Sequence, residues 1–544
     1  MNDAESFSAW ATLHRMVAES PQRHPVNDWH YRHPMAADDD LAMDLWPIIK
    51  VIYMVGACHR VHAGAASQAP VPLAPFDVLE PAKGARQGVP AVPAIRPPPA
   101  ALRWPTPDCH VLMLGGSAGN HDFDGYLAQK HLDPLRQALA LYGLRTATVL
   151  NDVAAKSPLI GRTLLGGTYG FAPVLLAAQR HLPSSGTFDL SELPGFDTWH
   201  AEISALYSFD SVLGRQALVE IIEKIYSTSY CLRRYFAYHA IKAVIGYCYY
   251  GVVGLATALA CRTLGIPYFD MQHGSAGRNH HCYHWPGAPE GGYNTLPSHF
   301  LCWSPVERRA IEDCASLRGP TALTVGHSWQ LMEQLIHEAR DSSGVAHGIP
   351  SAIGAHYAAQ CAAASQRKAA SAAAGLTTVL LTLRDDEDIG WLEPLLAEAA
   401  TDSHMRFLIR LHPTESRDAA RLARRVATLE TAAVEVTRPS HAPMPVVLRE
   451  CDLHLTHCSS SILDALAFGV PSISYSWSSR WFYSADQFQH IEVVPPEATA
   501  VRGALLAHRA APPPLSLPPA GLSLFEVGGL VAREILTLRT SKFA

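Results

Sequence analysis

Apolar runs bounded by turn residues alternate with longer amphipathic stretches from about residue 108 onward. The clearest runs lie at residues 110–114, 266–271, 378–383 and 406–411. A run of about four to eight apolar residues predicts a buried strand, and a stretch with helical periodicity over about ten or more residues predicts a helix. Strands that alternate with helices in this way are typical of α/β proteins with a parallel sheet.

The alternation falls into two sets, which predict two Rossmann-like domains. We expect the first domain at residues 108–318 and the second at residues 319–515, joined near residues 316–322. Domains typically hold about 100–200 residues, so a chain of 544 residues is expected to contain more than one. A last apolar stretch within residues 516–544 predicts a C-terminal helix that packs back on the first domain.

The first 107 residues do not belong to this alternation. Residues 1–63 predict a helical N-terminal extension, and residues 64–107, rich in Ala and Pro, predict a linker or surface strap. The most apolar early stretch, residues 45–57, is too short to span a bilayer and contains Lys50. We therefore interpret it as a core helix, with an interfacial anchor as the alternative. The chain starts without the basic-then-apolar pattern of a signal peptide.

Composition excludes one class of function and indicates a compartment. Apolar residues make up 48% of the chain, charged residues make up 17%, and the formal net charge is -6. General affinity for nucleic acid requires dense Lys and Arg, so we predict no nucleic-acid partner, while a local basic patch for a phosphorylated ligand stays open. The 11 cysteines include no CxxC pair, which indicates reduced thiols and a cytoplasmic protein.

Polar residues follow several of the predicted strands, and ligands of open α/β sheets bind beyond the carboxyl ends of strands. His412 ends the run at residues 406–411, and Pro413 stops the strand. From that position an imidazole can donate a hydrogen bond to a phosphate oxygen. The His-Pro pairs at residues 24–25 and 33–34 follow no predicted strand, so we single out His412 as a phosphate-binding and catalytic residue.

Three consecutive serines, Ser459, Ser460 and Ser461, connect another predicted strand to a predicted helix. Serine hydroxyls cap the free N–H groups of a helix start, and the same N–H groups and the helix dipole bind anions. Capping needs one serine, so three favour a phosphate-binding site, with capping alone as the alternative. Asp464 lies one turn further on; it either hydrogen-bonds a ribose or interacts with the positive end of the helix.

The sequence Gln272-His273-Gly274 ends a predicted strand of the first domain. An imidazole titrates near neutral pH and can accept a proton from a hydroxyl, so His273 is a candidate general base. Gly274 has no side chain, which lets an acceptor approach the backbone beside Gln272. The alternatives are a core histidine, a turn, or a metal site in the loop that follows. The spacing of the candidate metal ligands matches no standard zinc pattern, so we predict no metal; they are His280, His281, Cys282 and His284.

Two further strand ends carry weaker signals. Gly115 and Gly116 open a glycine loop that lacks the GxGxxG pattern, so they either admit a ligand or form a tight turn. Arg384 follows the run at residues 378–383 and is a candidate for binding the donor phosphate. The acidic residues that come after it favour capping of the next helix.

Several of these segments together resemble bacterial GT-B glycosyltransferases that build surface and capsular polysaccharides. The resemblance rests on GIPYFDMQHG, LPSHFLCWS and LTVGHSW and on the FDGYL and LDPLRQAL stretches, and it covers about residues 108–480. His412-Pro413 followed by Ser459-Ser460 is similar to the HP and SS motifs of bacterial sialyltransferases and polysialyltransferases, which hold the phosphate of a CMP-sugar. The CDP-glycerol transferases of teichoic acid synthesis use a related arrangement of His-Gly and His-Pro.

The resemblance implies a GT-B fold, in which an acceptor domain and a donor domain face each other across a cleft. It implies inverting, metal-independent transfer of a nonulosonic or Kdo-type acid from a CMP-sugar to a surface polysaccharide or other glycoconjugate. The nucleotide-sugar is then a co-substrate, no further cofactor is expected, and the protein works in the cytoplasm, free or at the inner membrane surface. His412 and the serines at 459–461 would stabilise the leaving phosphate, and His273 would take the acceptor's proton. Glycerophosphate transfer from CDP-glycerol and a non-catalytic binding role are the alternatives.

Overall fold

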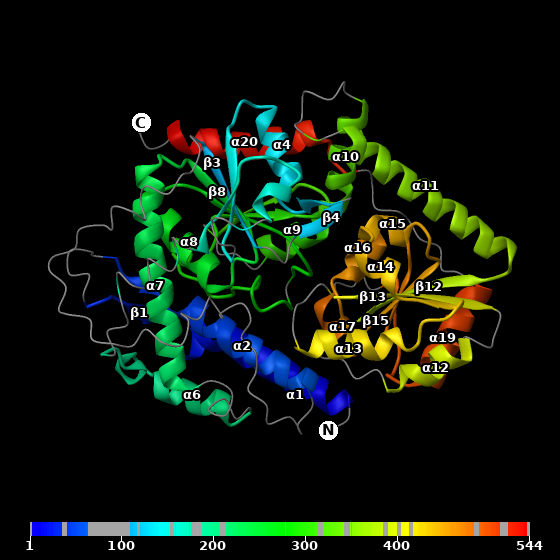
Figure 1. Ribbon diagram of the computed structural model, residues 1–544. Helices are drawn as coiled ribbons and strands as arrows, with labels where there is room; N and C mark the ends of the chain where they lie inside the picture. The colour runs from blue at the N-terminus through cyan, green and yellow to red at the C-terminus, as the bar shows by residue number, and fades with distance from the viewer. Residues whose placement is uncertain are drawn as a thin grey trace, which may run out of the picture.

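The chain folds into two lobes, which the computed structural model in Figure 1 shows coloured from blue to red along the sequence. The structure describes residues 3–34, 41–63, 109–116, 120–123, 125–152, 157, 159–172, 175, 182, 187–206, 214–277, 279–313, 319–341, 349, 351–383, 390–399, 404–412, 417–483, 489–511 and 521–540. The predicted Ala- and Pro-rich strap at residues 64–107 lies outside the described residues, and so does Arg384.

A parallel sheet of seven described strands forms the centre of the first domain. Most of its side chains are buried because helices pack on the sheet, and for this reason the sequence shows continuous apolar runs rather than alternation. In spatial order the strands are β11 (Thr321–Thr324), β10 (His299–Cys302), β9 (Tyr268–Met271), β8 (Ala243–Tyr247), β3 (Val111–Gly115), β6 (Thr146–Leu150) and β7 (Thr168–Gly170).

The second domain contains a parallel sheet of six described strands. In spatial order these are β14 (Val434–Glu435), β13 (Met405–Leu411), β12 (Thr377–Leu383), β15 (Leu453–Thr456), β16 (Ser472–Ser474) and β17 (Ile491–Val493). The second sheet follows the Rossmann order 3-2-1-4-5-6, and the first follows the same order with a seventh strand, β11, added beyond β10; the order reverses between β3 and β8 in the first and between β12 and β15 in the second. The predicted α/β class with two Rossmann-like domains, the GT-B arrangement, is therefore confirmed.

Helices cover both sheets, as Figure 1 shows. In the first lobe they are α4 (Asp133–Ala140), α7 (Arg215–Tyr238), α8 (Val252–Leu264), α9 (Pro305–Glu312), α10 (Ser328–Asp341) and the C-terminal α20 (Leu524–Thr540), whereas α6 (Phe196–Ser204) packs on the N-terminal helix α1 (Asp3–Arg23). In the second they are α11 (Ser351–Ala373), α12 (Leu392–Ala399), α13 (Arg417–Ala427), α14 (Thr437–His441), α15 (Met444–Leu448), α16 (Ser461–Ala467), α17 (Ser478–Phe482) and α19 (Ala498–Ala510). Helix α20 packs on α4 in the first domain, where Tyr142 donates a hydrogen bond to the carbonyl oxygen of Phe525.

The boundary between the domains lies further along the chain than the sequence predicts. Strand β11 pairs in parallel with β10, so it belongs to the first sheet although it follows the predicted boundary at residue 318. Helix α10 then packs on α4 and also contacts the second domain, where Gln330 donates to the carbonyl oxygen of Ala467, and α11 packs on β12 and α15 of the second domain. The alternation of strand and helix continues across this region without a break. For this reason the pattern alone placed the domain boundary too early in the sequence.

The segment after β3 also contains more regular structure than the predicted glycine loop. An antiparallel hairpin of β4 (Asn120–Phe123) and β5 (Tyr126–Gln129) comes before α4. The chain turns between these strands at Gly125, whose φ of +86° is a conformation that glycine adopts without strain. The hairpin matters for function because Lys130 follows it directly.

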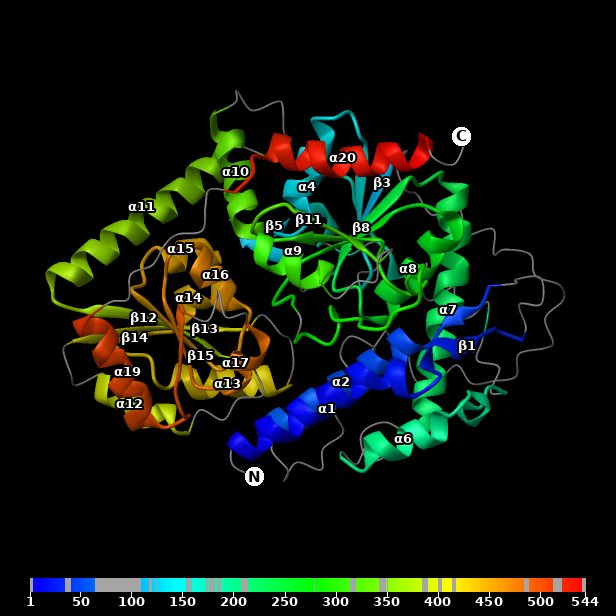
Figure 2. The same cartoon turned by 180° about the vertical axis from the view of Figure 1, so that it is seen from behind.

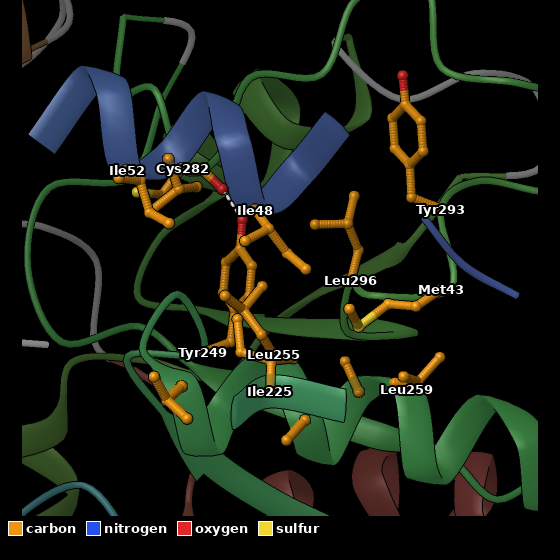
Figure 3. Close-up of a cluster of buried hydrophobic side chains, with 14 of the residues drawn as sticks. Met43, Ile48, Ile52, Ile225, Tyr249, Leu255, Leu259, Cys282, Tyr293 and Leu296 are labelled. Atoms are coloured by element: carbon orange, nitrogen blue, oxygen red, sulfur yellow. Dashed lines mark hydrogen bonds between the residues drawn. The ribbon is translucent and has the colours of Figure 1, made fainter. Parts of the chain in front are cut away.

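The N-terminal extension contributes α1 (Asp3–Arg23), α2 (Trp46–Ala63) and a short antiparallel pair, β1 (His30–Tyr31) and β2 (Met43–Asp44). Ile48 and Ile52 of α2 are buried, and Figure 3 shows them beside Tyr249 and Cys282 of the first domain. Lys50 is buried as well; its Nζ donates to the carbonyl oxygen of His284. The core-helix interpretation of residues 45–57 is thus confirmed. Across the described segments, no helix is both long and apolar enough to cross a membrane.

Helix α1 lies along the junction of the two domains, below both lobes in Figures 1 and 2. The ring of Trp10 is 6.5 Å from that of Phe482 in the second domain and 6.4 Å from that of His281 in the first. Next to it, Trp481 Nε1 donates to the carbonyl oxygen of Asn279 at 3.0 Å, which joins the domains directly. The N-terminal extension is therefore part of the interface that sets how the lobes meet.

Truncating Trp10 tests this role. Trp10 is 1% exposed, so Trp10→Ala leaves a cavity and is expected to lower the free energy of unfolding by about 3 kcal/mol or more. Urea unfolding followed by far-ultraviolet circular dichroism measures the change. Phe525→Ala is the matched control, because that aromatic ring is 60% exposed and its loss should have little effect. Equal free energies of unfolding for the two variants would show that Trp10 of α1 does not stabilise the junction of the domains.

Candidate functional site

A cavity of about 310 Å³ lies where the two domains meet at their strand ends. Rossmann-like sheets bind ligands where the strand order reverses, because the chain leaves the two central strands in opposite directions and opens a crevice. Tyr247 ends β8 in the first sheet, Leu383 ends β12 in the second, and both line the cavity. The other lining residues are His121, Lys130, His131, His273, Trp329, Thr382, Arg410, Leu411, His412, Met444, Ser459, Ser460, Ser461 and Asp464.

Most of the predicted site residues come together in this cavity. The first domain contributes His273, and the second contributes His412, Ser459, Ser460, Ser461 and Asp464. Four predicted residues are not among the lining residues: Gln272, Gly274, Gly115 and Gly116. Gly116 and Gly274 contact the lining residues Tyr247 and Ser460.

Gln272 and Gly274 fix the loop that carries His273. Gln272 is buried; its Nε2 donates to the carbonyl oxygen of Gly274 at 2.8 Å, and its Oε1 accepts from the backbone N–H of Trp303 at 2.7 Å. A Cβ atom at Gly274 would lie 3.3 Å from the Cβ of Ser460. The group that approaches Gly274 is therefore a serine of the second domain, whereas the sequence interpretation reserved this space for an acceptor.

Gly115 and Gly116 pack closely against the wall behind Tyr247. The Gly116 N–H donates to the Tyr247 hydroxyl at 3.0 Å, and its carbonyl oxygen accepts from Gln129 Nε2 at 2.7 Å. A Cβ atom at Gly115 would meet Leu132 at 3.0 Å. These contacts favour the tight-turn interpretation of the pair, with Tyr247 rather than a ligand as the close neighbour.

The three serines have three different surroundings. Ser461 is buried, and its Oγ lies 3.0 Å from Thr382 Oγ1 and 3.2 Å from His454 Nε2. Ser459 Oγ accepts from the backbone N–H of Ser461 at 3.3 Å, which shapes the turn before α16. The Ser460 side chain is exposed and forms no hydrogen bond with other described residues. Ser460 is thus the hydroxyl that is available to a ligand.

Arg410 supplies a cation to the same wall. Its Nη1 donates to the carbonyl oxygens of Pro439 and Ala442, each at 2.5 Å, which holds the guanidinium in place at the end of β13. Burial lowers the pKa of Arg410 to about 10, so the group stays charged at neutral pH. His412 follows two residues later; its side chain is exposed, and its backbone N–H donates to the carbonyl oxygen of Leu383 at 2.9 Å.

Asp464 is paired with a histidine that the sequence did not single out. Its Oδ1 lies 3.1 Å from Nε2 of His327, at the start of α10, and both side chains are buried. Although burial opposes ionisation, Lys130 and His327 hold the pKa of Asp464 at about 2, so it is a carboxylate at neutral pH. The pair crosses between the domains, because His327 belongs to the first and Asp464 to the second.

His273 is held by Tyr250, whose hydroxyl lies 2.9 Å from Nε2 of the imidazole. The same hydroxyl hydrogen-bonds Cys248, so when it donates to that sulfur it accepts from Nε2–H and leaves the lone pair on Nδ1. Burial and the nearby charge of Lys130 lower the pKa of His273 to about 4, so the ring is neutral at pH 7 and can accept a proton. Nδ1 is buried and forms no hydrogen bond with the described residues.

A strained turn positions Tyr250. Cys248 has a φ of +59°, an uncommon conformation for a residue with a side chain. The next backbone N–H, that of Tyr249, donates to Asp270 Oδ1 at 3.0 Å, and Asp270 Oδ2 accepts from Tyr283 at 3.2 Å. Strain of this kind persists only where the surroundings hold it, and such sites cluster at functional positions. The turn after β8 therefore supports the candidate base.

Sequence reasoning missed several lining residues. Arg410 and Thr382 are polar positions inside apolar runs, so a search for charged or hydroxyl residues near strand ends would have found them. Tyr247 ends β8, and the strand-end rule applies to it as well. Lys130 and His121 gave no signal, because the hairpin that places them was not predicted. The missed lining residues are His121, Lys130, His131, Tyr247, Trp329, Thr382, Leu383, Arg410, Leu411 and Met444.

The His-rich loop after His273 packs against the N-terminal helix. Among the residues that the structure describes, no three or more His, Cys, Asp or Glu side chains are grouped to hold a metal ion. The rings of His284 and His14 stack at 5.7 Å, and His14 lies 5.0 Å from Trp481. The loop thus joins α1 to both domains beside the cavity.

The buried histidines predict how stability depends on pH. Burial holds the pKa of His454 and His280 at about 3 and those of His273 and His299 at about 4. In the unfolded chain these groups titrate near about 6.5. Between about pH 6.5 and 4 the unfolded state therefore binds more protons, so the free energy of unfolding falls as pH is lowered, by up to about 1.4 kcal/mol per unit for each histidine.

Urea unfolding from pH 8 to 4.5 measures this dependence. Above about pH 6.5 we expect these groups to cause little change in the free energy of unfolding with pH. Below about pH 6.5 we expect the free energy of unfolding to fall steadily. His454→Gln removes one of them from the interior and should make the slope shallower. A free energy of unfolding that stays constant down to pH 4.5 would contradict the neutral, buried state of these imidazoles.

No protein-family model and no curated protein matches the chain. Among solved structures it is similar to UDP-GlcNAc 2-epimerase from Neisseria meningitidis bound to UDP-GlcNAc, at 10% identity and a TM-score of 0.44, covering 78% of this chain and 99% of that one. The Methanocaldococcus jannaschii UDP-GlcNAc 2-epimerase with UDP-GlcNAc and UDP gives 10% identity, a TM-score of 0.43 and coverage of 78% and 99%. A UDP-glucosyltransferase from Polygonum tinctorium is 12% identical, with a TM-score of 0.39, and the match covers 80% of this chain and 94% of that one. Similarity at this level identifies neither a substrate nor a reaction for this chain.

Proposed function

We propose that the protein transfers an acid sugar of the nonulosonic or Kdo type from a CMP-activated donor to a surface polysaccharide or glycoconjugate, with inversion and without a metal ion. One observation carries the proposal. A single cavity between two Rossmann-like domains brings a neutral imidazole, His273, opposite a cation and an imidazole of the other domain, Arg410 and His412. A proton acceptor and a site for a departing phosphate are what such a transfer requires.

The second domain binds the donor phosphate in this proposal. Arg410, His412 and the free hydroxyl of Ser460 supply positive charge and hydrogen-bond donors in one wall of the cavity. Negative charge grows on the phosphate as the bond to the sugar breaks, and donors held in place before the reaction supply several kcal/mol of stabilisation. The fixed guanidinium takes the role that a divalent cation has in metal-dependent transferases.

The first domain activates the acceptor. His273 takes the proton of the attacking hydroxyl, and Tyr250 keeps its ring oriented. The base and the phosphate-binding groups come from opposite domains, and in this proposal attack and departure take opposite faces of the anomeric carbon, which inverts its configuration. Asp464, with Oδ1 toward His327, offers Oδ2 to a ribose hydroxyl of the nucleotide. The acceptor is met in the cytoplasm, in solution or at the inner membrane surface.

A donor-cleavage assay tests the proposed function. The purified protein is incubated with CMP-N-acetylneuraminate, CMP-Kdo or CDP-glycerol, and released CMP is measured. We expect release from a CMP-linked acid sugar, and a loss of about tenfold to a hundredfold in kcat for His412→Ala, which removes one donor to the leaving phosphate. The exposed His356 provides a control, since His356→Ala should cleave at the wild-type rate.

Two outcomes would redirect the proposal. Cleavage of CDP-glycerol alone would assign glycerophosphate transfer to the same site, because attack would then occur at phosphorus. Absence of cleavage of all three donors, with His412→Ala indistinguishable from wild type in nucleotide binding, would favour a binding role for the fold.

A further inference from the structure

Lys130 is a cation in the cavity that forms no direct ion pair with a carboxylate of the described residues, although the charge of Asp464 acts on it from a longer distance. It follows β5 directly and lines the cavity from the first domain, with its side chain half-buried. Its Nζ lies 5.2 Å from the centre of the Trp329 ring. It forms no ion pair within 4 Å with any carboxylate in the described part of the chain. A charge taken partly out of water without a partner is unfavourable, and a ligand can supply that partner.

The charges around Lys130 do not balance within the protein. Asp464 is the lining carboxylate, and it is already close to His327 at 3.1 Å. Arg410 is a second lining cation, and its charge disfavours that of Lys130. The lining imidazoles His121 and His131 are neutral, because burial and Lys130 lower the pKa of both well below the usual value. Two cations, Lys130 and Arg410, thus face one carboxylate, Asp464. The net positive charge favours a ligand that carries a second anionic group in addition to its phosphate.

Lys130 belongs to a different domain from the residues of the phosphate-binding wall. Arg410, Ser460 and His412 belong to the second domain, whereas Lys130 comes from the hairpin of the first domain and lies near His273, whose pKa its charge lowers. The charge of Lys130 interacts with Arg410 of the second domain and with His273 of the first, so in the proposed arrangement an anion at Lys130 is close to both the departing phosphate and the base. In a 2-keto-acid sugar the carboxylate is attached to the anomeric carbon, which is the atom that lies between leaving group and nucleophile.

We propose that Lys130 binds the carboxylate of the transferred acid sugar and so selects acid over neutral sugars. The assignment rests on the proposed function, because it takes the phosphate to lie on the second domain and the base to be His273. The Trp329 ring below the ammonium keeps it in place, and the neutral imidazoles of His121 and His131 can add hydrogen bonds to the same carboxylate. A guanidinium at position 130 would preserve the charge, while a thioether would preserve only the packing.

The test compares an acid sugar with its own neutral ester. Wild-type protein saturated with CMP is titrated calorimetrically with N-acetylneuraminate and with its methyl ester, and likewise with Kdo and its methyl ester. We expect at least one acid to bind about tenfold or more tighter than its ester, since a charge-assisted hydrogen bond is lost in the ester. Lys130→Met is expected to abolish this preference, and Lys130→Arg to retain most of it. CMP affinity, measured in each variant, reports separately on the phosphate-binding wall.

Each outcome supports or overturns the assignment. Equal binding of acid and ester by the wild type, or absence of binding of both acids, overturns the carboxylate site while CMP binding leaves the proposed function standing. An unchanged acid preference in Lys130→Met also overturns it. If Lys130→Met loses CMP affinity and acid affinity by the same factor, Lys130 binds the phosphate instead. If the wild type does not bind CMP, the proposed function fails, and this inference fails with it. Circular dichroism of each variant checks that the fold is retained.

Discussion

His273→Ala is expected to lower kcat about 100- to 10,000-fold, because the removal of a general base costs that much in typical enzymes. The imidazole is neutral at pH 7, with a pKa near 4, and it lines the cavity from the first domain. Steady-state transfer from the CMP-linked donor that is cleaved in the wild type measures the loss. Donor binding should change little, since the phosphate is held by the other domain.

The pH profile separates a catalytic role from a structural one. In the wild type, kcat/KM should persist well below pH 6.5, because the base stays unprotonated until its pKa near 4. His356→Ala is the control for loss of an imidazole, since His356 is exposed on α11 and does not line the cavity. A His273→Ala variant that folds normally and turns over at the wild-type rate would remove His273 from the mechanism.

Arg410→Met is expected to lower kcat/KM about 100- to 1,000-fold, as found when one group that stabilises developing negative charge is removed. The guanidinium is fixed by the carbonyl oxygens of Pro439 and Ala442, so it requires little rearrangement in the transition state. Steady-state kinetics with the CMP-linked donor measures the change, and the melting temperature measures any loss of stability.

Arg410→Lys distinguishes the effect of the positive charge from that of the hydrogen bonds to Pro439 and Ala442. The lysine retains a cation but cannot reach both carbonyl oxygens and the ligand with the same planar group. Activity of Arg410→Lys well above that of Arg410→Met supports electrostatic stabilisation of the phosphate. Equal loss in both variants, with a lowered melting temperature, would show that Arg410 acts only by holding the segment at residues 439–442.

The fold follows from patterns that act locally. A parallel strand covered by helices needs a continuous apolar run, and the runs at β12, β13 and β15 therefore predict their own burial. Topology limits the remaining choices, because right-handed strand, helix and strand units add neighbours in sequence order. The domain boundary could not be predicted in this way. The pairing of β11 with β10 depends on contacts between segments, which a strand of four residues does not encode in its own sequence.

The candidate site was predictable where a residue follows a strand directly. His273, His412 and the serine cluster all lie at carboxyl ends of strands, so one geometric rule brings them together. Lys130 could not be predicted, because the hairpin before it depends on the turn at Gly125 and on docking against α10. The role of Ser460 could not be separated from those of Ser459 and Ser461 either. Only the packing of His454 and Thr382 around Ser461 shows which hydroxyl remains available.

Thermal unfolding of the wild-type protein with CMP, CDP, UDP or GDP tests most directly whether the gap between the domains holds a cytidine nucleotide phosphate. A ligand that binds only the folded state raises the melting temperature, and a concentration of about 100 times Kd adds about 2.7 kcal/mol. We expect CMP to raise it, with the rise strongly reduced in Arg410→Met. A rise with UDP or GDP alone, or a CMP effect that Arg410→Met leaves intact, would contradict the account.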